Sequence, residues 1–150
     1  MRPVWDQVAE KLVAVIPGLT PATIDLLVFS GQPISGDDPS HFVTVGYVAD
    51  DSGGTFAQQR NDNGFAMDET GDVRCQFVSQ TGDTLVAGVA REVFDIVGSL
   101  QTYINGNQTL DGVLSQDGYC SMSSEIRSEL DEQGSAQSLV LTFRYWTSTY

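Results

Sequence analysis

The stretch from Asp83 to Asn105, DTLVAGVAREVFDIVGSLQTYIN, decides the expected fold. Its apolar residues recur with the i, i+3, i+4, i+7 spacing of one helix face over about six turns. Asp83 and Thr84 are suitable N-cap residues, and Asn105-Gly106 is a suitable C-terminal stop. A helix of this length is roughly 30 Å long, so it needs a wide apolar surface to pack against.

The segments on both sides of this helix have the composition of strands, so we expect its partner to be a sheet. Strands are expected at 26–30, 41–48, 68–80, 119–127 and 138–147. In the last of these, large residues occupy both alternating positions, which indicates a strand that is central or covered on both faces. A first helix is expected at 3–16, ended by Pro17-Gly18.

Helix, strands, long helix and strands in this order predict an α+β fold. We expect a mainly antiparallel β-sheet packed against one long central helix plus an N-terminal helix. The 150 residues are expected to form a single domain, 1–150. Within it, residues 50–63 are polar and contain glycine, and we expect them to form a long flexible excursion.

The chain is strongly acidic, with a formal net charge of −13. Such a surface repels phosphates, which argues against a protein that grips DNA or RNA or binds anionic membranes. It suits the wall of a channel through which DNA only passes. The simpler alternative is that the composition reflects only genome base composition or a saline habitat. No apolar run reaches the ~20 residues of a membrane span, and the start of the chain lacks a signal-peptide core, so we expect synthesis in the cytoplasm.

Motifs for catalysis and for cofactor or metal binding are missing from the sequence. There is one histidine, His41, and no P-loop, dinucleotide fingerprint, zinc-protease motif or nucleophile elbow. The run Asp50-Asp51-Ser52-Gly53-Gly54 lacks the register of an EF-hand and is better explained as a solvated turn. Cys75 and Cys120 lie far apart, which favours buried free thiols over a disulfide or a metal site. We expect no enzyme activity, no cofactor and no metal.

The order of these elements resembles the tail-terminator family of long-tailed bacteriophages, a group close to other head–tail joining proteins. The resemblance covers nearly the whole chain and rests on the order of several short stretches. After the N-terminal helix these are VFSG at 28–31, FVTVGY at 42–47, CQFVSQTGD at 75–83 before the long helix, TLDGV at 109–113 and LTFRYW at 141–146.

The resemblance implies a structural virion protein without catalysis or cofactor. Such proteins form a hexameric ring that caps the tail tube, ends its polymerisation and joins it to the head. The implied partners are further copies of the chain, the tail tube protein and the head–tail connector protein, while DNA is only passing cargo. The implied location is the head-proximal end of the phage tail. Another head–tail joining protein or a tail tube protein is the nearest alternative.

A ring requires two different complementary patches on each subunit. Polar excursions can become ordered on assembly, so we predict that residues of 50–63 contribute to an interface. The terminal aromatics Tyr145, Trp146 and Tyr150 either cap the core or contact another subunit. The residues predicted for the interface are Asp50, Asp51, Gln58, Gln59, Arg60, Asn61 and Asp62.

An alternative from another class is a small acidic ligand-binding domain or enzyme. The sheet would then hold a pocket near Arg74, Arg144 and Trp146. An arginine beside an aromatic ring can hold an anion there.

Overall fold

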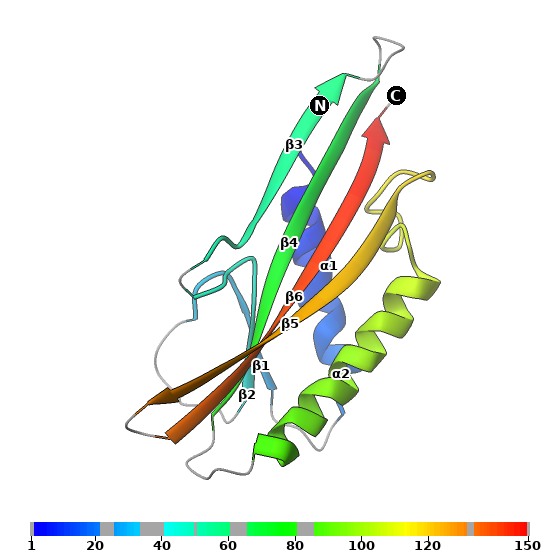
Figure 1. Cartoon of the computed structure of the whole chain (residues 1–150). Coiled ribbons are helices and arrows are strands. Elements are labelled where there is room, and N and C mark those ends of the chain that lie inside the picture. The colour runs from blue at the N-terminus through cyan, green and yellow to red at the C-terminus, as the bar shows by residue number, and fades with distance from the viewer. Residues whose placement is uncertain are drawn as a thin grey trace.

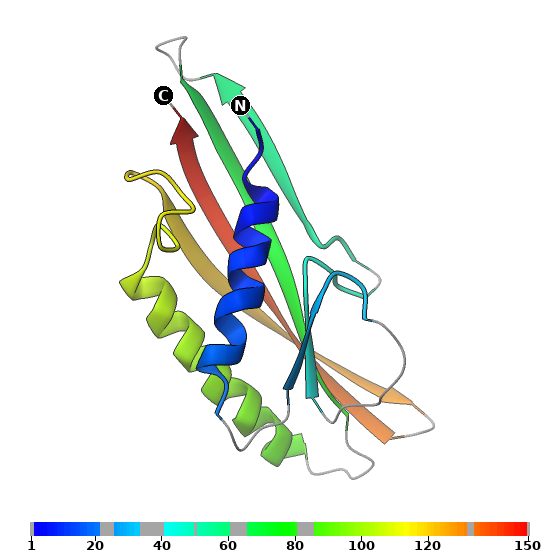
Figure 2. The same cartoon turned by 180° about the vertical axis from the view of Figure 1, so that it is seen from behind.

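The computed structural model describes residues 2–21, 26–33, 41–49, 51–60, 66–80, 86–131 and 134–149. Six strands form one twisted sheet, and both helices cover the same face of it, as Figures 1 and 2 show from opposite sides. In chain order the elements are α1 (Trp5–Leu19), β1 (Leu26–Ser30), β2 (His41–Val45), β3 (Gly54–Arg60), β4 (Met67–Gln80), α2 (Val86–Gly106), β5 (Tyr119–Asp131) and β6 (Gly134–Thr149).

The sheet has the strand order β1-β2-β4-β6-β5, and β3 pairs with β4 as well. β4 pairs with β6 along its whole length, but its other side is divided between two strands. β3 pairs with β4 from Met67 to Val73, and β2 pairs with it from Cys75 to Ser79. β2 and β3 therefore lie end to end along one side of β4, interrupted opposite Arg74.

The predicted fold class, with a mainly antiparallel sheet packed against one long central helix and an N-terminal helix, is wrong. The structure is mostly β-sheet, and the sheet is mixed because β1 and β2 run parallel. α2 is not central, since it shares one face of the sheet with α1 (Figure 2). Periodicity shows which side of a helix is apolar, but it does not show which strands the helix covers or how those strands pair.

The prediction that residues 50–63 form one flexible excursion is also wrong for part of that range. Gly54–Arg60 forms β3, which pairs with β4 residue by residue. The polar residues of β3 are compatible with a strand because it lies at an exposed edge of the sheet, where few side chains are buried.

α1 also runs further than expected, because it passes through Pro17 and ends at Leu19. Proline fixes φ at a helical value but has no N–H to donate to the carbonyl four residues earlier, and α1 ends two residues after it. The end of α1 is closed by Thr20, whose backbone N–H donates to the Pro17 carbonyl at 3.3 Å and whose hydroxyl donates to the Ile16 carbonyl at 2.8 Å.

The core lies between the helix layer and the sheet. Alternate residues of β4 and β6 point into it, which explains their apolar alternation. No helix in the described part of the chain is long and apolar enough to cross a membrane. Six helix side chains are at most 1% exposed, namely Val8, Leu12, Ile16, Ile96, Leu100 and Ile104.

The two cysteines are buried free thiols on the core side of the sheet, as predicted. Burial raises the pKa of Cys120 to about 12, and it also raises the pKa of Cys75. Both thiols therefore stay protonated and act as small apolar core residues.

Leu100→Ala should lower the free energy of unfolding by about 3 kcal/mol, because Leu100 is fully buried and its truncation leaves a cavity. The matched control on the same helix is Phe94→Ala, at a side chain that is 48% exposed, and it should cost less than about 1 kcal/mol. Urea unfolding of both variants measures the difference. Equal costs would show that α2 does not pack on the sheet through Leu100.

Candidate functional site

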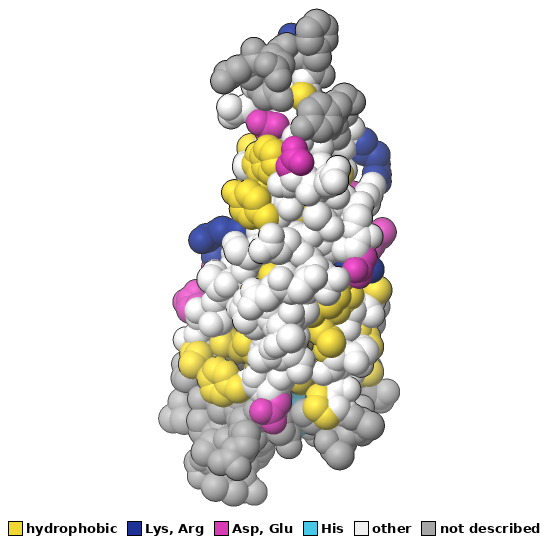
Figure 3. Space-filling view, turned by 90° about the vertical axis from the view of Figure 1, so that its right-hand side faces the viewer, with side chains coloured by type: hydrophobic (Ala, Val, Ile, Leu, Met, Phe, Trp, Pro, Cys, Tyr) yellow, Lys and Arg dark blue, Asp and Glu magenta, His cyan; other side chains and the backbone are white. Residues whose placement is uncertain are grey.

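The sheet ends in two different edges. β5 forms one edge, while β3 and β1 form the other, and each of these strands pairs on one side only within the described residues. Among the described residues, five large hydrophobic side chains are exposed, and four of them lie on these edge strands: Leu27, Phe56, Tyr119 and Ile126. Figure 3 faces the side that carries α2 and shows exposed hydrophobic side chains in separate groups. Unpaired strand edges are templates for pairing with another chain.

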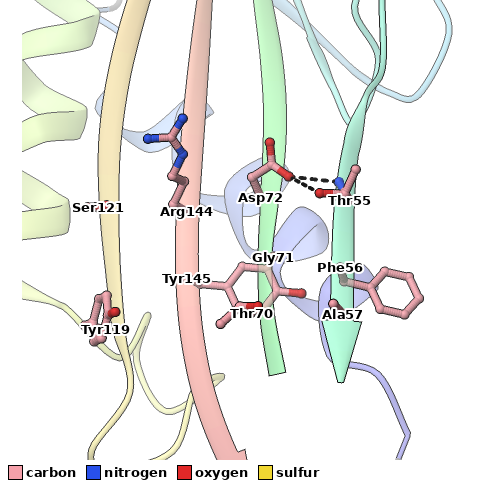
Figure 4. A pocket seen from close by; sticks show the side chains of 10 residues that line it. All are labelled: Thr55, Phe56, Ala57, Thr70, Gly71, Asp72, Tyr119, Ser121, Arg144 and Tyr145. Carbon is pink, nitrogen blue, oxygen red and sulfur yellow. Dashed lines mark hydrogen bonds between the residues drawn. The ribbon is translucent and has the colours of Figure 1, made fainter. Parts of the chain in front are cut away.

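The sheet face opposite the helices carries a hollow of about 600 Å³, shown in Figure 4. Within the described part of the chain, no group of three His, Cys, Asp or Glu side chains is placed to hold a metal ion there or elsewhere. Four strands contribute the lining residues, which are Thr55, Phe56, Ala57, Thr70, Gly71, Asp72, Tyr119, Ser121, Arg144 and Tyr145.

Arg144 is the cation of this hollow. It lies opposite Asp72 in the register of β4 and β6, yet the two side chains diverge (Figure 4). Asp72 instead accepts hydrogen bonds from the Thr55 N–H and hydroxyl, at 2.9 and 2.7 Å. Arg144 makes no ion pair with any side chain that the structure describes. An open face with one available guanidinium can accept a carboxylate.

The pocket predicted near Arg74, Arg144 and Trp146 is formed only in part. Arg144 lines the hollow, and Trp146 stacks against its lining residue Tyr119 with ring centroids 6.1 Å apart. Arg74 is not among the lining residues, because it pairs with Asp51 at 3.0 Å.

The segment between β2 and β3 leaves and rejoins the sheet at Arg74. The Arg74 carbonyl accepts the Gly46 N–H at 2.8 Å, and its N–H donates to the Gly53 carbonyl at 2.9 Å. The segment is packed rather than extended into solvent, since Val48 is 1% exposed and the Ala49 N–H donates to the Gln76 side chain at 2.9 Å.

Asp51 fixes this segment across the open face. Its Oδ2 lies 3.0 Å from Arg74 on β4 and 2.9 Å from Arg127 on β5, so it bridges over β6. The hydrogen bond from Arg127, the Ser52 N–H and the charge of Arg74 together lower the pKa of the Asp51 carboxyl. This carboxylate is therefore engaged within its own chain.

Asp51→Asn should destabilise the fold at neutral pH, because it removes the charge that both arginines contact. A carboxyl whose pKa is lowered by folding stabilises the fold above its unfolded pKa, and this contribution is lost as the pH falls through the folded pKa. The stability difference between wild type and variant should therefore shrink below about pH 4. The control is Asp95→Asn, at an exposed acid on α2. A pH-independent difference in urea unfolding would contradict the role of this ion pair.

Glu69 forms the buried polar network that positions β3 and α1. It is 0% exposed, and it accepts hydrogen bonds from the Gln58 side chain at 3.0 Å, the Tyr145 hydroxyl at 2.7 Å and the Val4 N–H at 3.1 Å. Val4 is the N-cap of α1, where the helix dipole favours a negative charge. Burial raises the pKa of the Tyr145 hydroxyl, and the hydrogen bond to Glu69 raises it further. The hydroxyl therefore stays protonated and remains a donor.

Glu69 was not among the candidate residues predicted from the sequence. Its position in the sequence was the available signal. Glu69 lies at every second position with Gly71, Val73 and Cys75, so it shares the face of β4 that points into the core.

Glu69→Ala should lower the free energy of unfolding by about 3 kcal/mol or more, because it leaves three donors without an acceptor, the buried Tyr145 hydroxyl and the partly buried Gln58 amide and Val4 N–H. The neighbouring acid Asp68 lies on the opposite face of the same strand, so Asp68→Ala is the matched control and should have a small effect. Denaturant titration compares the two. A similar small effect for both would remove Glu69 from this structural role.

The predicted interface residues that the structure describes lie in two separate places. Gln58, Gln59 and Arg60 lie on the β3 edge, where Gln58 is half-buried and the other two are exposed. Asp51 lies beyond the other end of β3, in its ion pairs. Asp50, Asn61 and Asp62 lie outside the described residues.

No protein-family model matches this chain, and no curated protein matches it either. Its function is therefore inferred from the geometry of the sheet and from the order of the sequence elements.

Proposed function

We propose that this protein is a structural, non-enzymatic subunit that assembles into a closed ring, and that the ring is the tail terminator of a long-tailed bacteriophage. The order of the sequence elements supports the family. The proposed assembly rests on one observation: among the strands that the structure describes, the sheet ends in two unlike edges that pair on one side only, and each edge carries exposed hydrophobic side chains.

Two unlike edges favour a head-to-tail contact. Where the same patch meets itself, two copies form a closed dimer, but where one edge meets a different edge, the contact repeats from copy to copy. Such a repeat closes into a ring when the rotation between copies divides a full turn. The β3 and β1 edge of one copy would meet the β5 edge of the next, and the family resemblance sets the expected number of copies at six.

The β3 edge retains part of the predicted interface. Gln59 and Arg60 are exposed on it and are free to contact a neighbouring copy or the tail tube. Asp51 is engaged with Arg74 and Arg127 of its own chain, so we assign it a structural role instead.

The distribution of charge supports a channel that does not retain DNA. Among the side chains that the structure describes, four basic residues form ion pairs: Arg2 with Asp6, Lys11 with Asp111, and Arg74 and Arg127 with Asp51. Few cations remain to hold phosphates, and the net charge of −13 repels them. DNA would pass through such a ring without being retained.

The ring would sit between two partners, the tail tube protein and the head–tail connector protein, and would need no cofactor. A tail tube protein is the nearest alternative and differs in one respect, because its rings stack into long tubes. A terminator adds a single ring and prevents further growth.

We expect one of two results. The protein has the mass of six 16.2 kDa chains in solution, or it is a monomer in solution that is recruited to the ends of tail tubes. Size-exclusion chromatography with light scattering measures the mass, alone and with purified tail tubes. Every copy has a formal net charge of −13, so the copies repel one another. Self-association through apolar contacts should therefore become stronger as salt screens this repulsion.

Tail tube protein alone is the control in a polymerisation assay, and tubes should stop growing once this protein is added. Open-ended polymers of this chain would favour a tube protein. A monomer that does not bind tail tubes would contradict the proposal. It would favour the alternative of a ligand-binding domain that uses the hollow around Arg144.

A further inference from the structure

The register of the sheet places residues of the two opposite edges in common rows. Phe56 on β3 pairs with Gly71, Gly71 pairs with Tyr145, and Tyr145 pairs with Cys120 on β5. Phe56 therefore lies in the row next to that of Tyr119, the exposed aromatic residue of the β5 edge.

A second row gives the same relation lower in the sheet. Leu27 on β1 is connected to Arg127 on β5 through the successive pairs of Phe42, Val78 and Ser138. Leu27 therefore lies in the row next to that of Ile126, the exposed aliphatic residue of the β5 edge.

The spacing between these positions is equal on the two edges. The rows of Phe56 and Leu27 cross β4 at Gly71 and Val78, seven residues apart (78 − 71). Tyr119 and Ile126 are also seven residues apart on β5 (126 − 119). Along the strand direction, at about 3.4 Å per residue, each edge presents two exposed hydrophobic side chains roughly 24 Å apart, and Leu27 lies one strand further out than Phe56 because β2 separates β1 from β4. A displacement of one row aligns both pairs at once.

We propose that neighbouring copies meet through these two pairs, with Phe56 against the neighbour's Tyr119 and Leu27 against the neighbour's Ile126. The inference rests on the ring proposed above and names its contact surface. The occupant of each edge is a second copy, because the same chain carries both halves of the matched spacing. Figure 4 shows the Phe56 ring directed off the β3 edge.

The directions of the side chains specify how the edges meet. Phe56 and Ile126 alternate with the open-face residues of their strands, whereas Leu27 and Tyr119 belong to the open face. Each contact thus joins a helix-side residue of one copy to an open-side residue of the other. This condition is met when the two edges cross at an angle instead of lying in one plane. One end of an edge then lies on the helix side of the neighbouring edge, and its other end lies on the open side. A rotation of roughly 20–25°, as between adjacent strands, raises and lowers the two ends by roughly 5 Å, which is about the thickness of a side chain.

Paired cysteine substitutions test this alignment. The matched variants are Phe56→Cys with Tyr119→Cys, and Leu27→Cys with Ile126→Cys, each in one chain. The mismatched controls exchange the partners, Phe56→Cys with Ile126→Cys and Leu27→Cys with Tyr119→Cys. All four sites are exposed, so the variants should fold, and thermal unfolding checks this. The assembled protein, alone or at tail tube ends, is treated with a short bismaleimide and analysed on denaturing gels.

The matched variants should give a ladder of covalent oligomers that ends at the ring, and the mismatched and single-cysteine variants should stay monomeric. A ring that forms normally but links only in the mismatched variants, or in neither set, would overturn this alignment and leave the ring proposal standing. Dimers from Phe56→Cys alone would overturn it in favour of a contact of like edges. Wild-type protein that never assembles, even with tail tubes, would overturn the ring and this alignment together.

Discussion

The backbone of β4 has to be paired on both sides, and the rest of the architecture follows from how this is achieved. Buried N–H and C=O groups need partners, and β4 is one of the interior strands that carry the core. β6 satisfies one side over fourteen residues. The other side needs two strands, β3 and β2, and Arg74 bridges the break between them through its own backbone.

This division determines which surfaces are available to partners. β3 pairs only with β4, so it is an edge strand. β1, which pairs with β2, forms the rest of the edge on that side of the sheet. The helices cover one face only, and α1 is fixed there by the Glu69 carboxylate at its N-terminus and by the Trp5 indole N–H, which donates to the Asp72 carbonyl at 2.7 Å. The Asp51 segment covers part of the other face. Among the described strands, the two edges remain unpaired, and the proposed ring uses them.

The sequence predicted local features better than global ones. The 3.6-residue period of 83–105 indicated a helix, and α2 occupies most of that stretch. The large residues on both sides of the last strand indicated a central or covered strand, and β6 is central, since it lies between β4 and β5, although the helices cover only one of its faces. By contrast, Gln58, Gln59 and Arg60 have the composition of a loop, and only their pairing with β4 makes them a strand. The parallel pairing of β1 and β2, the network around Glu69 and the matched rows of the two edges depend on register between distant segments, which a single sequence does not encode locally.

The most direct test of the central claim, that unlike sheet edges join the copies, is an electron cryomicroscopy reconstruction of the assembly at the end of a tail tube. We expect one closed ring in which the β3 and β1 edge of each copy lies against the β5 edge of the next. Copies related by two-fold axes, or copies that contact each other through α1 and α2 while both edges stay exposed, would contradict the claim.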